Sequence, residues 1–448
     1  MPFSSINFLF LVPLLLMVYW ALPQNLKRAW LCSSSVLVYI YAGVPDLMLL
    51  LAVTLTNWLS HKWLPESRTT RAIMIITNIL VLGWFKYRFF IAGIFHIDHR
   101  PIELIVPLGI SFYIFQLISY QVEIHKKILV APPTFFSFFL YIFFFPHHQA
   151  GPIMRPHAFL SAFVSGRPWN SHRFKSGLVI LLWGLAKKIW LADLLFSGIV
   201  NERYALLEQS HGLTGNVLFL GCLYGGQIYA DFSGYSDIAV GLGKMFGFKL
   251  DRNFHQPYIA MGPSEFWRRW HVTLSQWLRD YIYIPLGGNR SGKFRTRLNM
   301  LIVMLVGGLW HGANWTFIVW GGLHGLFLIA EIIQKDLKIK SSLITLLIYQ
   351  CLFMITWVPF REQNFNFIWT MVRRYDGWIG IETIYALLII TGIVCFSYLE
   401  DRLEHYFCRI SILVHRLPVL MFSPAYATAI YIILCGVKNE TTFIYQRF

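Results

Sequence analysis

The sequence predicts an all-α, polytopic membrane protein, and three observations support this fold class. First, 56% of the 448 residues are hydrophobic and only 13% are charged, about half the charged fraction of a soluble domain. Second, no segment has the alternating pattern of a transmembrane β-barrel. Third, long charge-free runs recur, and about 20 apolar residues allow a helix to cross a bilayer. These runs are residues 1–26, 29–44, 47–60, 72–85, 104–122, 128–154 and 298–330.

The net charge of +16 is spread over short loops beside the apolar segments. This distribution is typical of cytoplasmic loops, so we expect no nucleic-acid partner. Placing the N-terminus outside puts the basic loops at 27–28, 62–71 and 126–127 inside. The first segment lacks a basic start and a cleavage site, which favours a retained helix over a signal peptide. Neither the six scattered cysteines nor the two adjacent histidines at 147–148 have the ligand spacing of a metal site.

Two regions depart from a simple alternation of helix and loop. In residues 131–156, five prolines interrupt an aromatic segment that has basic flanks on both sides. Because both flanks are expected on the same side of the membrane, this segment is predicted to enter the bilayer and return. Irregular backbone at that depth requires protein or water around it. We therefore expect a re-entrant element lining an internal cavity; a misassigned loop is the alternative.

The second region, 244–297, holds ten Lys or Arg against three acidic residues and is expected in the cytoplasm. Within it, 264–290 has the periodicity of one amphipathic helix. Its apolar stripe consists of Phe266, Trp270, Leu274, Trp277 and Tyr281. Its polar face consists of Glu265, Arg268, Arg269, Gln276 and Arg279. Such a helix is expected at the membrane interface, with His271 beside the stripe. A simple membrane anchor is the alternative.

His311 stands out because it lies within a charge-free run, 298–330. A break at 321–322 would divide this run into one full span and the start of another, with His311 near the middle of the first. Polar groups at such depth are costly and usually face a bundle interior or a water-filled path. Neighbouring glycines leave room for another backbone or a substrate, and an imidazole exchanges a proton near neutral pH. Catalysis is one hypothesis for His311, and a packed structural histidine is the other.

Two further groups of polar residues are expected to be structural. His324 is 13 residues beyond His311, about 20 Å along a straight helix, so the two share a site only if the chain breaks. Asp231, Ser233 and Asp237 lie close together, but two carboxylates six residues apart do not share a helix face. Helix capping or cavity lining is therefore favoured over catalysis for this group.

Two sequence blocks carry a family resemblance. FWRRWHVTLSQWLRDYIYIPLGGNR and GGLWHGANWTFIVWGGLHG, supported by PLGISFYIFQLISY, AGPIMRP and YADFSGYSDIAVGLG, resemble the membrane-bound O-acyltransferase (MBOAT) family. More narrowly, they resemble its bacterial branch of alginate and peptidoglycan O-acetylation proteins. The resemblance covers about residues 107–325 and implies one integral domain over 1–448. It implies a ring of transmembrane helices around a central tunnel, with re-entrant and horizontal interfacial helices. It also implies that His311 is the catalytic histidine and His271 the second histidine of the site.

The resemblance implies a function as well. An acetyl group is taken from a cytoplasmic donor, acetyl-CoA, with no bound cofactor and no metal. It is passed across the membrane for O-acetylation of a polysaccharide such as alginate or peptidoglycan. The implied location is the bilayer of the bacterial inner membrane, and the implied protein partner is an extracytoplasmic SGNH-type acetyltransferase.

Candidate substrate-binding residues follow from this implied donor. Arg268 and Arg269 are expected to attract the phosphates of coenzyme A, with anchoring to anionic lipid as the alternative. Trp310 and Asn314, which flank the catalytic position, are further candidates. Other functions stay open at this point: D-alanyl transfer from a carrier protein, a non-catalytic polysaccharide or lipid transporter, and a scaffold that only recruits the extracytoplasmic enzyme.

Overall fold

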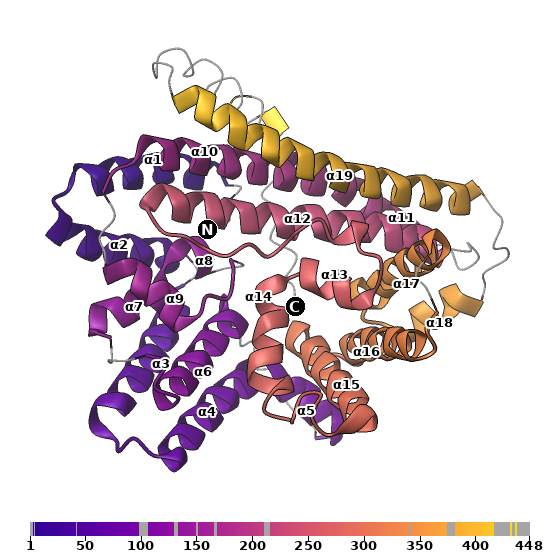
Figure 1. Cartoon of the computed structure of the whole chain (residues 1–448), viewed down its shortest axis with the longest axis horizontal. Coiled ribbons are helices and arrows are strands. Elements are labelled where there is room, and N and C mark those ends of the chain that lie inside the picture. The colour runs from indigo at the N-terminus through magenta and orange to yellow at the C-terminus, as the bar shows by residue number, and fades with distance from the viewer. Residues whose placement is uncertain are drawn as a thin grey trace. The chain divides into compact units, whose positions relative to one another are not determined.

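The computed structural model describes residues 3, 5–41, 43–97, 106–129, 133–148, 151–164, 168–209, 216–339, 342–373, 381–415, 431 and 435–436. All regular structure in these ranges is helical and no strand occurs in them, which confirms the all-α prediction (Figure 1). The chain divides into two compact units. The first includes residues 1–185 and 235–252, and the second includes 186–234 and 253–410.

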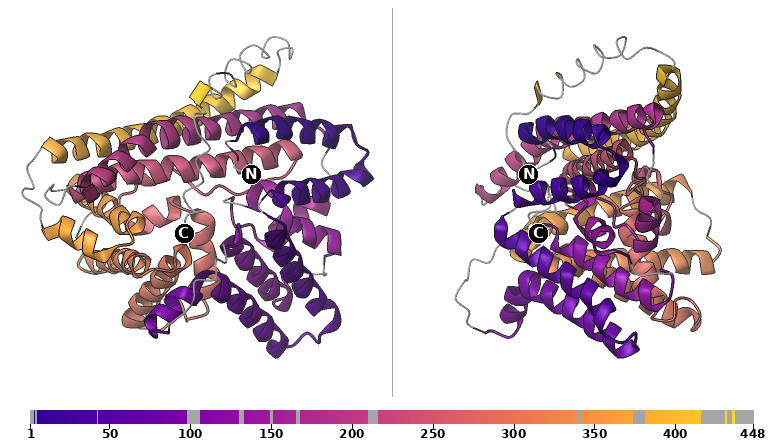
Figure 2. Two further views of the ribbon diagram at one scale, coloured as in Figure 1. Left: turned by 180° about the vertical axis from the view of Figure 1, so that it is seen from behind. Right: turned by 90° about the vertical axis from the view of Figure 1, so that its left-hand side faces the viewer.

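Short, mostly apolar helices make up the first unit, and α3, α4 and α6 pack side by side within it (Figure 2). Its helices are α1 (Ile6–Ala21), α2 (Gln24–Ile40), α3 (Val44–Trp63), α4 (Arg68–Leu82), η1 (Gly83–Tyr87), α5 (Arg88–Ile94), α6 (Ile110–His125), α7 (Phe135–Phe143), α8 (Phe145–His148), α9 (Pro156–Val164) and α10 (Ser171–Ala186).

The second unit contains the histidine blocks identified in the sequence. Its helices are η2 (Lys187–Phe196), α11 (Ser197–Gln209), η3 (Pro257–Ile259), α13 (Pro263–Arg269), α14 (Val272–Leu278), η4 (Arg279–Tyr283), α15 (Gly292–His311), α16 (Trp315–Asp336), α17 (Leu343–Arg361), α18 (Phe365–Arg373) and α19 (Ile381–His415). The long helix α12 (Val217–Phe246) contributes residues to both units, and the C-terminal ends of α10 and α19 likewise fall in the other unit.

Among the described residues, four helical segments are long and apolar enough to cross a bilayer. They are 68–94, formed by α4, η1 and α5, and 315–336, 343–361 and 381–400. The first of these contains a lysine, Lys86, in the π-helical segment η1. Its Nζ donates a hydrogen bond to Ser111 Oγ of α6 at 3.3 Å. The charge therefore contacts protein, as expected for a cation within an apolar segment.

The proline-rich segment 131–156 does not form a spanning helix. Its longest helix, α7, has nine residues and is therefore about 14 Å long, half of the roughly 30 Å hydrocarbon core. The residues that follow are buried in protein, and His147 Nε2 lies 2.9 Å from Gln116 Nε2 and 3.1 Å from the carbonyl oxygen of Tyr141. Residues 131–132 and 149–150 lie outside the described ranges. A short, protein-enclosed segment agrees with a re-entrant element, whose depth in the bilayer stays a prediction.

Candidate active site

The region predicted as one helix over 264–290 consists of two short helices and a π-helical segment, so that prediction is wrong. Helix α13 ends at Arg269, and α14 begins at Val272. The break lies at His271, whose φ of 41° and ψ of 53° place its backbone in the left-handed region. This conformation costs a residue with a Cβ about 1–2 kcal/mol. Counting periodicity missed the break because neither glycine nor proline marks it.

Asn253 holds the chain at this break. Its backbone carbonyl accepts a hydrogen bond from Val272 N at 2.9 Å, and its side-chain Oδ1 accepts one from the Thr273 hydroxyl at 2.6 Å. Asn253 is 1% exposed, so these hydrogen bonds do not compete with water. They offset the strained backbone and hold His271, which is fully buried, in the interior of the unit.

The aromatic stripe of this region packs inside the protein. Phe266, Trp270, Leu274 and Trp277 are all buried. The ring of Trp270 lies 5.0 Å from that of Phe254 and 4.8 Å from that of Trp357. The stripe therefore contributes to the core of the second unit, which a simple membrane anchor would not require.

The charge-free run 298–330 forms a helical hairpin of α15 and α16 (Figure 1). The turn lies at 312–314 and not at 321–322, which is inside α16, so the predicted break was misplaced. His311 is consequently the last residue of α15 instead of lying near the middle of a span. Asn314, a candidate substrate residue, caps α16: its Oδ1 accepts a hydrogen bond from Thr316 N at 3.0 Å.

Glycines allow the two helices of the hairpin to touch. A Cβ on Gly308 would overlap the carbonyl oxygen of Phe317, and a Cβ on Gly321 would overlap that of Met304. Small residues at such contacts are typical of helix pairs in membranes. Of the two uses predicted for the room beside His311, Gly308 serves the approach of a neighbouring backbone, while Gly312 faces the ring of Phe317.

The rings of His311 and His271 both contact the ring of Trp310. The ring centroid of Trp310 lies 5.0 Å from that of His311 and 5.8 Å from that of His271. Phe232 of α12 covers His271 edge-on at 4.7 Å. Burial lowers the pKa of His271 to about 3, so its imidazole is neutral at pH 7. Two histidines from separate sequence blocks are thus brought together, and Trp310 joins them.

His324 belongs to the same aromatic cluster but has a structural partner. The ring of Trp320 lies 5.0 Å from His311 and 4.7 Å from His324. The Thr356 hydroxyl donates a hydrogen bond to the carbonyl oxygen of Phe353 at 2.7 Å. Its oxygen therefore accepts the hydrogen bond from Nε2 of His324 at 3.1 Å. The turn at 312–314 brings His311 and His324 to one cluster. Their separation of 13 residues allows this only because the chain turns between them.

The two candidate arginines differ in their surroundings. Arg269 donates from Nε to Glu265 Oε1 at 2.9 Å and from Nη1 to the carbonyl oxygen of His255 at 3.0 Å. Burial opposes ionisation of Glu265, but hydrogen bonds from Met261 N and Arg269 outweigh it and lower the pKa of this carboxyl. Arg268 is exposed. Arg269 thus ties α13 to the preceding loop, and Arg268 is the arginine at the surface.

Sequence reasoning missed a group of buried charges at α12. Lys188, which is 1% exposed, forms ion pairs with Asp231 and, at 2.8 Å, with Asp193. Lys187 contacts Glu400 of α19 at 2.8 Å. Asp231 lies in the middle of α12, so of the two roles expected for it, helix capping is excluded and cavity lining stays a prediction. The available signal was the pair of adjacent lysines within the otherwise apolar segment 177–192.

Comparison with known proteins identifies the family. The sequence profile of the membrane-bound O-acyltransferase family, MBOAT, matches residues 113–357. The probable alginate O-acetylase AlgI of Azotobacter vinelandii is 37% identical over 83% of this chain and 77% of that protein. The peptidoglycan O-acetyltransferase of Helicobacter pylori is 32% identical over 79% of this chain and 74% of its own length. The teichoic acid D-alanyltransferase of Bacillus subtilis is 25% identical over 89% and 96%, respectively.

The helical architecture and these matches define a multi-pass membrane acyltransferase. The chain belongs to the membrane-bound O-acyltransferase family. The resemblance carried by the two histidine blocks is therefore confirmed. The roles of His311, His271, Arg268, Arg269, Trp310 and Asn314 stay predictions, as do the central tunnel and the single domain over 1–448.

Proposed function

We propose that this protein takes an acetyl group from cytoplasmic acetyl-CoA and passes it across the bacterial inner membrane for O-acetylation of a polysaccharide. The observation that carries the proposal is the meeting of His311 and His271 at the ring of Trp310. Acetyl rather than D-alanyl transfer is favoured because the relatives named as O-acetylases are 32–37% identical, against 25% for the D-alanyltransferase of Bacillus subtilis.

His311 acts as the general base in this proposal. Its imidazole takes the proton from an acceptor hydroxyl, and the hydroxyl oxygen attacks the carbonyl carbon of the acetyl thioester. The tetrahedral intermediate then collapses, the C–S bond breaks, and the proton passes to the leaving thiolate. The products are an acetate ester and coenzyme A thiol. No resident cofactor or metal takes part.

The aromatic surroundings of His311 suit this chemistry. Trp310, Trp320 and Phe360 pack around the imidazole, which is 2% exposed, so charge develops in a region of low dielectric. The indole N–H of Trp320 is buried, and the described residues give it no hydrogen-bond partner. We assign this donor to the oxyanion of the tetrahedral intermediate. Neutral His271 fixes Trp310, and with it the orientation of the base.

The remaining substrate contacts follow from charge. The exposed Arg268 binds coenzyme A phosphates at the cytoplasmic face, while Arg269 holds α13 in place.

The acetyl group leaves the site toward an extracytoplasmic SGNH-type acetyltransferase, which esterifies the polysaccharide. Alginate and peptidoglycan are the acceptors named for the relatives, and a polymer of either class is the proposed final acceptor.

Purified protein in nanodiscs with acetyl-CoA labelled in the acetyl group tests the proposal. If the protein is an acetyltransferase, coenzyme A thiol is released only when a hydroxyl acceptor is added. The label is then recovered as an ester. Binding or flux of polysaccharide without release of thiol would favour a transporter. Polymer acetylation in cells that express a protein inactive in this assay would favour a scaffold.

A further inference from the structure

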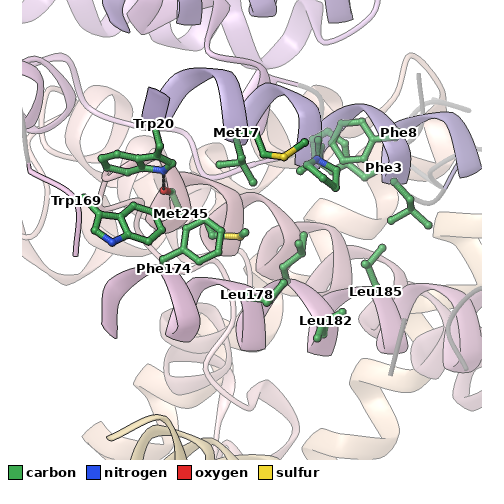
Figure 3. Close-up of a pocket in the computed structure, with 15 residues that line it drawn as sticks. Phe3, Phe8, Met17, Trp20, Trp169, Phe174, Leu178, Leu182, Leu185 and Met245 are labelled. Atoms are coloured by element: carbon green, nitrogen blue, oxygen red, sulfur yellow. Dashed lines mark hydrogen bonds between the residues drawn. The ribbon is translucent and has the colours of Figure 1, made fainter. Parts of the chain in front are cut away.

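The interiors of the two units differ in polarity. In the first unit, a cavity of about 450 Å³ lies between α1 and α10, and its lining side chains are apolar or aromatic (Figure 3). In the second unit, Lys188 and Asp231 form an ion pair in which each side chain is 1% exposed. The lost hydration of a buried ion pair is often not offset by its attraction, so such a pair is weak evidence of a stabilising role. The pair therefore raises the hypothesis of a role in positioning.

Asp231 lies next to Phe232 in the middle of α12. Successive residues of an α-helix point about 100° apart, so these two side chains face different neighbours. Asp231 contacts Lys188 of η2, while the buried ring of Phe232 covers His271 edge-on, with ring centroids 4.7 Å apart. Because the two residues belong to one rigid helical turn, the ion pair fixes the rotation of α12 that places Phe232 on His271.

A second set of contacts holds the same turn of α12. The Tyr229 hydroxyl donates a hydrogen bond to Glu400 Oε2 at 2.5 Å, and Lys187 Nζ lies 2.8 Å from the other oxygen of this carboxylate. The rings of Tyr229 and Phe232 both pack against Phe254, at 5.9 and 5.0 Å. The two adjacent lysines that make these ion pairs lie in the π-helical segment η2, a local structure frequent at functional sites.

We propose that Asp231 is a positioning residue of the candidate active site, whose ion pair with Lys188 holds Phe232 against His271. The effect on catalysis rests on the proposed function, in which His271 fixes Trp310 and with it the orientation of the base. The contact itself is testable without any measurement of activity. Asp231→Asn keeps the size of the side chain but removes its charge, so the ion pair no longer fixes the rotation of α12.

Chemical modification of histidines in the purified full-length protein tests the contact. Diethyl pyrocarbonate acylates neutral imidazoles that it can reach, and mass spectrometry measures the rate at each histidine. His271 and His324 are both fully buried and should react slowly in the wild-type protein. In Asp231→Asn we expect His271 to react about tenfold faster, a factor within the range of couplings in one salt-bridge network. His324 should stay protected.

Two further variants complete this experiment. Lys188→Met breaks the same ion pair from the η2 side and should expose His271 to the same extent. Asp193→Asn is the matched control, because it removes another carboxylate paired with Lys188 and leaves the contact between η2 and α12 in place. His271 should therefore stay protected in Asp193→Asn.

Kinetic measurements connect the contact with catalysis. Because His271 orients the base and does not contact the donor phosphates, Asp231→Asn should lower kcat about tenfold, as a small misplacement of a catalytic group does. KM for acetyl-CoA should stay the same, and Asp193→Asn should leave both constants unchanged. Faster modification of His271 with an unchanged kcat would support the positioning role and contradict the part that the proposed function gives to His271.

Three results would overturn the proposal. The first is wild-type protection of His271 in both Asp231→Asn and Lys188→Met. The second is equal reactivity of His271 and His324 in these variants, which indicates a general opening of the second unit. The third is an equal effect of Asp231→Asn and Asp193→Asn on the modification of His271.

Discussion

At the scale of single residues, the left-handed backbone of His271 depends on hydrogen bonds from outside the helices that it joins. Asn253 supplies two of them, to Val272 N and to the Thr273 hydroxyl. Asn253→Ala removes Oδ1, so the buried Thr273 hydroxyl loses its hydrogen-bond acceptor. This loss lowers the free energy of unfolding by about 1–3 kcal/mol. We expect a lower midpoint of thermal unfolding in detergent and a loss of acetyl transfer that follows it.

A double-mutant cycle separates this contact from general damage. Thr273→Val removes the other partner of the same hydrogen bond. Because the two residues share that bond, the double variant should cost less than the sum of the single variants. Additive losses would show that Asn253 does not act through Thr273.

Trp320 gives a kinetic prediction at the same scale. Trp320→Phe keeps an aromatic ring beside His311 but removes the indole N–H assigned to the oxyanion. Loss of one such donor costs about 10²–10³ in kcat, and KM for acetyl-CoA should change little. Trp267→Phe is the control, since its ring lies 5.1 Å from His324. Equal losses of kcat in both variants would contradict the assignment of the Trp320 indole N–H to the oxyanion.

Sequence reasoning identified the histidines of this site but not the residues that hold them. His311 and His271 were recognisable because an imidazole in an apolar run is rare and because both lie in distinctive blocks. Asn253, Phe232 and Thr356 were not, because their contacts join segments that are remote in the sequence. The structure gives Asn314 a helix-capping role that the sequence analysis did not predict, while its contact with substrate stays a prediction.

At the scale of helices, the packing of α15 on α16 determines where His311 lies. Gly321→Ala places a methyl group against the carbonyl oxygen of Met304 and should force the two helices apart. Overpacking of this kind costs about 1–3 kcal/mol, and we expect lower stability together with lower acetyl transfer. Gly322→Ala is the matched control: its methyl group would meet Leu305 Cδ2 at 3.5 Å, an ordinary contact. Similar losses in both variants would contradict the close-contact argument.

The predicted helices show which signals in a sequence are reliable. The charge-free run 298–330 is helical, as predicted, but the break predicted at the two adjacent glycines 321–322 lies at 312–314. Gly321 serves helix contact, while Asn314 marks the true start of α16 as an N-cap. In 264–290 the residues on both sides of His271 are helical, so the helical periodicity of the sequence does not reveal the break between α13 and α14.

At the scale of the whole molecule, charge predicts the orientation in the membrane. The segment 244–297, with ten cations against three acids, is expected in the cytoplasm, where the donor would be met. A cysteine placed at Ser291 in a cysteine-free protein should resist a membrane-impermeant thiol reagent in intact cells. It should react after permeabilisation. Labelling in intact cells would reverse the orientation and exclude a cytoplasmic donor site at Arg268.

The fold class of the whole chain was predictable because composition and charge-free runs are global properties. The described residues are helical throughout their regular structure, as predicted. The buried ion pairs of Lys187 and Lys188 were not foreseen. Two of their partners, Asp231 of α12 and Glu400 of α19, lie up to 213 residues away in the sequence, so the adjacent lysines indicate buried charge but do not identify these partners.

The same substitution at two histidines of one aromatic cluster tests the central claim most directly. His311→Gln keeps a polar side chain but cannot cycle a proton near neutral pH, and general acid–base assistance contributes about 10²–10⁴-fold. His324→Gln keeps a donor for Thr356 Oγ1 and removes no proposed catalytic group. Polymer acetylation is measured in cells that contain equal amounts of each protein in the membrane. We predict that His311→Gln reduces acetylation at least 100-fold and that His324→Gln retains most of it. Wild-type acetylation by the His311→Gln protein would contradict the assignment of His311 as the catalytic base.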